Sequence, residues 1–248
     1  MTTVVTAFYE IPSKFTPDRY WNWIKNFCEI DCNLVLFTSP NLVERFLKLK
    51  SSKTVIIPLQ FEKLHHYKFI NLYKLHHNLD HHKSIHSPEL YIIWAEKVKF
   101  VMRAIELNPF NSQKFVWCDI GVVREPQFLN IFKNFPKGEK IVENKMNFLL
   151  LNPFTNEDKI ETNNIKGPIY GSIRMGGGIH AADIETWKKY DNLWDSTLRR
   201  YFEANRFAGQ DQMIMATICL ENEYLFHLIT PKDYGGDPWF YLLYYWSV

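Results

Sequence analysis

The sequence predicts an α/β protein in which helices flank a mostly parallel central sheet. The main observation is the alternation of strand and helix patterns over the first sixty residues. A second observation is the apolar segment 115–118, which is followed directly by Asp119. A buried parallel strand that ends in this way places a carboxylate at the edge of the sheet. The expected strands are residues 4–9, 33–38 and 53–59, and the helices between them are 18–30 and 42–49.

The rest of the chain extends this pattern, and residues 1–248 are expected to form one domain. Ser87 and Pro88 are residue types preferred at a helix N-cap and first position, so a helix should run from there to about residue 107. Later elements are expected to be strands at 140–151 and 224–229, a polar loop at 152–167, and helices at 184–190, 194–207 and ending at 219.

The composition is that of a globular protein, with 46% apolar and 23% charged residues. The aromatic fraction of 16% suits stacking on sugars or bases, although such residues are more often core. A net charge of +2 is too small for a nucleic-acid groove, and no apolar run approaches the roughly 18 residues that span a bilayer. Four scattered cysteines fit reduced thiols. We therefore expect a cytoplasmic protein without a nucleic-acid partner or a transmembrane segment.

Residues 61–86 interrupt the pattern and are rich in histidine. Paired histidines suggest a metal site, but the segment has few of the carboxylates or cysteines that complete one. Its lysines would also repel a cation. A polar helical excursion within the domain is therefore favoured over a metal site. The segment holds seven of the nine histidines: His65, His66, His76, His77, His81, His82 and His86.

Three later motifs carry residue types that are suited to catalysis or ligand binding. Asp119 follows the apolar strand, and Gly121 leaves room beside its carboxylate for a ligand or a metal-bound phosphate. A turn of the form Asp-x-Gly is the structural alternative. Residues 176–178 are a triple glycine, expected to form a close-packed turn, and Asp211 lies in the sequence Gly-Gln-Asp-Gln at 209–212. A sugar-transferring enzyme needs an acid or metal site, an open wall and a second acid, and these three motifs offer all of them.

Together with other segments, these motifs resemble a known family over nearly the whole chain. The segments are Val-Thr-Ala-Phe-Tyr at 5–9, Ser-Pro-Glu-Leu-Tyr at 87–91, Asn-Pro-Phe-Asn at 108–111, Trp-Cys-Asp-Ile-Gly at 117–121 and Gly-Gln-Asp-Gln at 209–212. They resemble the HtrL/YibB-like family, which is grouped with glycosyltransferases of the GT-A fold. The resemblance implies a nucleotide-sugar donor and a glycan or glycoconjugate acceptor.

The resemblance also implies a cation site for the donor diphosphate. Asp119 would take the first position of the Asp-x-Asp element that holds Mn²⁺ or Mg²⁺ in GT-A enzymes, but Gly121 stands where the second acid would be. His227, on the expected late strand, would be a further metal ligand or else a core histidine. Lys97 and Arg124 would neutralise donor phosphates, with a surface cation as the alternative for Lys97.

The remaining expected site residues surround the donor sugar. Asp211 would be the acid near the anomeric carbon and take the acceptor's proton, or else serve as a helix N-cap. Gly177 would lie beneath the sugar, with Arg174 facing phosphate. Trp239 would stack on sugar or acceptor from a C-terminal lid, or else belong to an aromatic tail on the core.

Two other functions compete with this hypothesis. A Rossmann-type oxidoreductase requires Gly-x-Gly-x-x-Gly after the first strand, and Tyr9-Glu10-Ile11-Pro12 stands there instead. The second is a non-catalytic sugar- or nucleotide-binding protein that kept the fold, an alternative that Gly121 leaves open.

Overall fold

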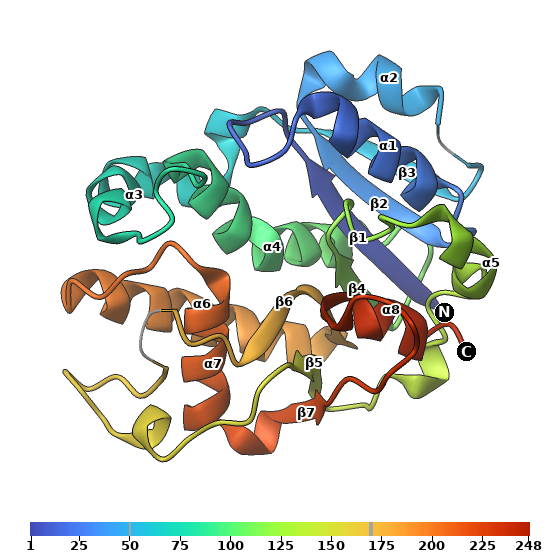
Figure 1. Ribbon diagram of the computed structural model, residues 1–248. Coiled ribbons are helices and arrows are strands. Elements are labelled where there is room, and N and C mark those ends of the chain that lie inside the picture. The colour runs from blue at the N-terminus through green and yellow to red at the C-terminus, as the bar shows by residue number, and fades with distance from the viewer. Residues whose placement is uncertain (50, 169–170) are drawn as a thin grey trace.

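A seven-stranded sheet forms the centre of the computed structural model, which describes residues 1–49, 51–168 and 171–248. The strand order is β3-β2-β1-β4-β6-β5-β7 (Figure 1). The strands are β1 (Thr2–Phe8), β2 (Asn33–Thr38), β3 (Thr54–Pro58), β4 (Lys114–Cys118), β5 (Met146–Leu150), β6 (Met175–Asp183) and β7 (Phe226–Ile229). The helices are α1 (Pro17–Cys28), α2 (Val43–Leu47), α3 (Ile70–His76), α4 (Pro88–Leu107), α5 (Leu129–Phe132), α6 (Ile184–Glu203), α7 (Asp211–Glu221) and α8 (Tyr241–Tyr245).

The predicted class, α/β with a mostly parallel sheet flanked by helices, is confirmed. Strands β1 to β4 are mutually parallel, as are β5 and β7, whereas β6 runs antiparallel to both of its neighbours. Side chains alternate across the sheet. Val4 faces Trp21 of α1 and Phe46 of α2, and its neighbour Val5 faces the core that contains α4. The helices therefore form a layer on each face (Figure 1).

The chain changes direction across the sheet between β1 and β4. Strands β2 and β3 extend the sheet on one side of β1, and β4 lies on the other side. In open α/β sheets a crevice forms outside the carboxyl ends of the strands at such a switch point, and ligands bind there. The topology thus places a binding site beside Phe8 and Cys118, the last residues of β1 and β4.

The triple glycine does not form the predicted turn. Gly176, Gly177 and Gly178 lie inside β6, which pairs with β4 and, through an irregular register, with β5. A Cβ on Gly176 would lie 3.0 Å from the Leu149 side chain, so glycine lets the two strands pack closely. The turn prediction was wrong because a run of glycines carries no side-chain alternation to indicate a strand.

Two further differences concern element lengths. The helices expected at 184–190 and 194–207 are one helix, α6, which Asp183 caps by accepting a 2.9 Å hydrogen bond from the Thr186 amide. No proline or glycine interrupts it, and its buried Trp187, Tyr190 and Trp194 recur at helical spacing. The strand expected at 140–151 is confined to β5. In the described part of the chain, no helix is long and apolar enough to cross a membrane.

One buried histidine in this core has no polar partner. His180 of β6 is fully buried and its ring stacks on Phe148 with centroids 4.5 Å apart. Within the described residues neither ring nitrogen has a hydrogen-bond partner. Burial holds the pKa of His180 well below its usual range, and Lys97 acts in the same direction. The ring is therefore neutral in the folded protein.

We expect His180→Phe to reduce the loss of folding stability that the protein shows at acidic pH. The unfolded chain binds a proton at His180 below about pH 6.5, whereas the folded chain does not. Stability is thus lost as the pH falls below that value, by at most about 1.4 kcal/mol per pH unit for this residue. Urea unfolding at pH 7.5 and 5.5 should show a smaller loss in His180→Phe than in wild type. The exposed His82, changed to Phe, is the control, and an equal pH dependence in all three proteins would contradict the prediction.

Candidate functional site

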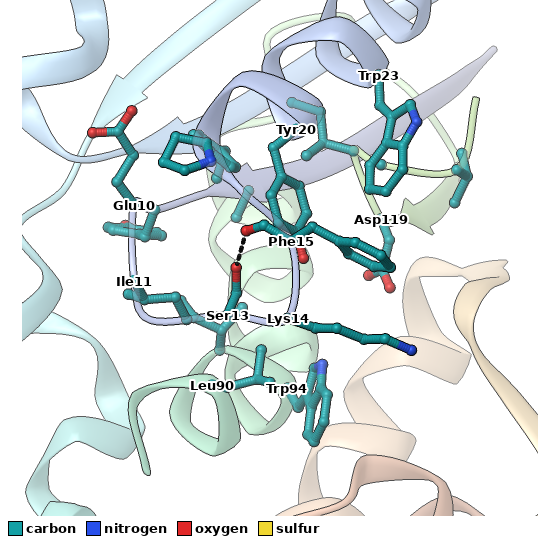
Figure 2. Close-up of a pocket in the computed structure, with 18 of the residues that line it drawn as sticks. Glu10, Ile11, Ser13, Lys14, Phe15, Tyr20, Trp23, Leu90, Trp94 and Asp119 are labelled. Atoms are coloured by element: carbon teal, nitrogen blue, oxygen red, sulfur yellow. Dashed lines mark hydrogen bonds between the residues drawn. The ribbon is translucent and has the colours of Figure 1, made fainter. Parts of the chain in front are cut away.

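A pocket of about 660 Å³ opens at the carboxyl ends of β1 and β4, where the topology predicts it. Its volume is typical of small-molecule sites. Figure 2 shows Phe15, Tyr20 and Trp23 on one side of the cavity and Leu90 and Trp94 on the other. The structure brings four of the predicted site residues to its lining: Lys97, Asp119, Gly121 and Arg124.

A buried lysine joins the two predicted acids. Lys97 Nζ, on α4, lies 3.1 Å from Asp119 Oδ1 and 2.8 Å from Asp211 Oδ2. It also donates a 2.9 Å hydrogen bond to the Gly177 carbonyl oxygen. The Lys97 side chain is 3% exposed, so the surface-cation alternative is wrong. We call Lys97, Asp119 and Asp211 the acid–lysine cluster.

Electrostatics keep this lysine charged. Burial by itself lowers the pKa of Lys97, but the attraction of Asp119 and Asp211 outweighs it, and the pKa is raised. Partial desolvation by the surrounding protein likewise raises the pKa of Asp119, against the opposing effect of Lys97. The cluster brings two carboxyl groups to one ammonium group, so the exposed Asp119 carboxyl group remains available to a cation.

Asp119 is the most exposed member of the cluster, and it lines the pocket together with Lys97. Its side chain is 39% exposed, whereas that of Asp211 is 1% exposed. The Asp119 amide donates to the Gly178 carbonyl oxygen at 2.8 Å, and Trp117 Nε1 donates to Asp119 Oδ1 at 2.7 Å. These bonds fix the carboxylate at the end of β4 and leave part of it open to a ligand.

One glycine of β6, Gly177, makes room for Asp211. A Cβ on Gly177 would lie 2.7 Å from Asp211 Oδ2, a distance that side chains do not tolerate. A Cβ on Gly178 would lie 3.4 Å from Asp119 Oδ2, which is ordinary contact. Gly177 therefore allows the close approach of Asp211 and Lys97 to the strand.

We expect Gly177→Ala to destabilise the protein by about 1–3 kcal/mol, because the new methyl group would displace the buried Asp211 carboxylate. Gly178→Ala is the matched control on the same strand and should cost clearly less. Urea unfolding of the two variants measures the difference. Equal stability of the two variants would show that Gly177 is not needed to accommodate Asp211.

Arg124 provides a positive charge at the pocket. Its guanidinium lies 4.8 Å from the ring centroids of both Trp23 and Phe240 and 5.8 Å from that of Phe15. Across the described ranges no carboxylate lies within salt-bridge distance of it. Aromatic rings thus hold an exposed guanidinium whose hydrogen-bonding edge remains available to an anion.

Two other predicted ligands lie elsewhere. Arg174 donates to the buried Asp158 at 2.7 Å, which occupies its guanidinium. His227 lies on β7, three strands from β4, which corresponds to about 14 Å at roughly 4.8 Å per strand. Ligand atoms of one ion lie within about 4–5 Å of each other, so the sheet does not allow His227 and Asp119 to share a cation.

Asp211 and Trp239 lie outside the lining of the pocket. Asp211 is the first residue of α7, and the N-cap position falls on Gln210, so the N-cap alternative does not describe it. Its burial also leaves no path for an acceptor hydroxyl to reach it directly. Trp239 is half-buried and precedes Phe240, which lines the pocket.

Comparison with known proteins identifies the family. A family model described as a bacterial protein of unknown function, HtrL_YibB, matches residues 1–245. The chain belongs to the HtrL_YibB family. Protein HtrL of Escherichia coli strain K12 is 21% identical over 268 residues, which cover 96% of this chain and 90% of that protein.

Two solved structures are similar to this HtrL_YibB protein at a low level. Apo mouse xyloside xylosyltransferase 1 has a TM-score of 0.47 and 10% identity, over 92% of this chain and 85% of that one. A glycosyltransferase involved in the glycosylation of the major capsid of PBCV-1 has a TM-score of 0.42 and 15% identity, over 92% and 80% of the two chains. Similarity this low assigns no chemistry to the HtrL_YibB site.

Several pocket residues were not predicted from the sequence. Lys14 and Phe15 belong to the loop after β1, and Trp94 lies on α4 one turn before Lys97. The loop after the first strand was available as a signal, because ligands bind at the carboxyl ends of strands in this fold class. Nothing in the local pattern distinguishes Trp94 from the buried aromatic residues of the core.

Proposed function

We propose that this HtrL_YibB protein is a glycosyltransferase of the GT-A type, which moves a sugar from a nucleotide-sugar donor to a glycan or glycoconjugate acceptor. The observation that carries the proposal is the acid–lysine cluster at the end of β4, one of whose acids opens into a ligand-sized pocket at the switch point of the sheet. Such a pocket combines a charged end for a diphosphate with apolar walls for rings.

The donor diphosphate is assigned to the side of the pocket between Arg124 and Asp119. Arg124 would bind phosphate oxygens through its free edge. Asp119 fits a Mn²⁺ or Mg²⁺ ion, because Mg²⁺ is commonly held by one or two carboxylates together with substrate phosphates. Gly121 supplies no second carboxylate, so phosphate oxygens and waters would complete the coordination. A cation there would offset the negative charge of the departing diphosphate.

Gly177, expected beneath the sugar, is buried and does not line the pocket, so the donor sugar is assigned to the part of the lining next to Lys97. Asp211 then acts through Lys97, by holding its ammonium group in place between the two carboxylates. This is a positioning role and not that of the base proposed from the sequence, since the Asp211 side chain is 1% exposed.

The aromatic walls are assigned to the nucleobase and the acceptor. Tyr20 is half-buried beside Asp119 and Trp94 is half-buried on the opposite wall, while the buried Trp23 supports Tyr20 from behind with ring centroids 5.4 Å apart (Figure 2). Planar bases and sugar rings both stack on such side chains. Trp239, next to the pocket-lining Phe240, remains our candidate for closing the C-terminal side.

We place the reaction in the cytoplasm. The proposal is supported by the four cysteines, Cys28, Cys32, Cys118 and Cys219, which are all free thiols. Burial raises the pKa of Cys28 and of Cys32 to about 12, which makes both unreactive. A reducing compartment suits such a protein.

A thermal-shift screen with UDP, GDP, CMP and dTDP sugars, with and without Mn²⁺, tests the proposal. A ligand of the folded state raises the melting temperature by mass action, about 2.7 kcal/mol of stabilisation at one hundred times Kd. We expect one nucleotide class to raise it, more strongly with Mn²⁺, and the corresponding sugar nucleotide to be turned over to the free nucleotide. Binding without turnover would favour the non-catalytic alternative, for which Gly121 is the supporting observation. No shift with any donor would contradict both.

A further inference from the structure

The histidine-rich segment contains a second polar cluster, outside the lining of the pocket. His65 and His66 begin the 3-10 helix His65–Phe69, and Asp195 lies in the middle of α6. One ligand atom from each of these residues lies within 4.8 Å of the others. We propose that His65, His66 and Asp195 form a binding site for a zinc ion, which we call the histidine site.

A buried carboxylate fixes the orientation of His66. Glu96 of α4 is fully buried and accepts hydrogen bonds from the backbone amides of His65 at 2.8 Å and His66 at 2.9 Å. Its Oε2 atom also lies 2.8 Å from His66 Nδ1. Glu96 already accepts from two backbone amides, and with Nδ1 as a further donor this is the carboxylate–histidine arrangement that supports metal-binding imidazoles.

The opposite nitrogen of His66 then presents a lone pair toward Asp195. His66 Nε2 is buried and has no hydrogen-bond partner in the parts of the chain that the structure describes. Asp195 Oδ1 is 3.8 Å away from it, too far for a hydrogen bond. A buried polar atom without a partner is costly, and an ion between these two atoms would satisfy both.

Two lysines near the cluster are compatible with a cation. Lys99 Nζ donates a 2.8 Å hydrogen bond to Asp195 Oδ2, which leaves Asp195 Oδ1 for the ion. The exposed Lys68 lies 3.0 Å from His65 Nε2 and can turn into solvent when a metal binds. Lys68 therefore competes with the metal for His65.

Two imidazoles and one carboxylate are a donor set suited to zinc. Zn²⁺ accepts histidine nitrogen and carboxylate oxygen and is often held by three protein ligands with a fourth position open to water. Mg²⁺ and Ca²⁺ prefer oxygen donors alone. Residues 61–86 hold few carboxylates, and those beside His65 and His66 come from α4 and α6, a placement that only the fold reveals. Zinc here would tie the histidine-rich segment to α6.

Titration of the metal-free protein with ZnCl₂, followed by calorimetry and by the melting temperature, tests the proposal. We expect one equivalent to bind and to raise the melting temperature. His65→Ala and Asp195→Asn should each weaken binding at least tenfold. Asp191→Asn is the matched control, because Asp191 also pairs with Lys99, at 2.6 Å, but is not a proposed ligand. It should leave the affinity unchanged.

Lys68→Ala gives a second and opposite result. Removing the competing ammonium should strengthen zinc binding, which no purely structural role of the histidines predicts. Asp119→Asn should not alter zinc affinity, which separates this site from the proposed donor site. The proposal is overturned if wild type binds no zinc, or if His65→Ala and Asp195→Asn bind it as tightly as Asp191→Asn.

Discussion

Lys97→Met is expected to destabilise the protein by about 3–5 kcal/mol, the cost of leaving a buried charge without its partner. Lys97 lies 2.8 Å from Asp211, and both side chains are almost completely buried. Methionine fills similar volume but cannot neutralise the carboxylate or donate to the Gly177 carbonyl oxygen. Urea unfolding at pH 7.5 measures the change in the free energy of unfolding.

The double variant Lys97→Met with Asp211→Asn separates charge from packing. With the buried carboxylate neutralised as well, much of the lost stability should return, because replacing both members of a buried pair costs less than removing one. If the loss of stability in the double variant equals the sum of the losses in the two single variants, the pair is not coupled. That result would remove the acid–lysine cluster from this account.

Asp119→Asn is expected to lower the turnover of the sugar nucleotide by roughly 10²–10³-fold, the typical loss when one electrostatic contact to the transition state is removed. The substitution keeps the shape of the side chain and removes the charge that faces the pocket. Donor turnover, measured as release of the free nucleotide, gives the effect.

The same variant should keep its stability. Partial desolvation raises the pKa of Asp119, so ionisation of this group does not favour the folded state, and Lys97 retains Asp211 as a partner. Asp31→Asn, on an exposed acid paired with Lys53, is the control for turnover. Wild-type turnover in Asp119→Asn would exclude Asp119 from the site.

The first half of the fold follows closely from the sequence. The strands at 4–9 and 33–38 correspond to β1 and β2, and the helix begun by Ser87 and Pro88 corresponds to α4. These elements have strong local signals, namely apolar periodicity and capping residues. The triple glycine has none, and strand β6 was missed because its Gly176–Gly178 segment is specified by contacts across the sheet.

The site was predicted only in part, because some of its residues have local sequence signals and others are brought together only by the fold. Asp119 was recognisable because it ends an apolar strand. The partnership of Lys97 with Asp211 was not, because the two residues are far apart in sequence and meet only when α4 and α7 pack on the sheet. The distance of His227 from Asp119 likewise follows from the strand order, which local patterns do not encode.

The most direct test of the central claim is a calorimetric titration of wild type, Arg124→Ala and Arg45→Ala with UDP, GDP, CMP and dTDP in the presence of Mn²⁺. Arg45 is the matched control, because its guanidinium packs 3.6 Å over Trp21 but does not line the pocket. We expect one nucleotide to bind wild type and Arg45→Ala equally and to bind Arg124→Ala at least tenfold more weakly, about 1.4 kcal/mol. Absence of binding, or equal binding to all three proteins, would contradict a nucleotide-sugar site in this pocket.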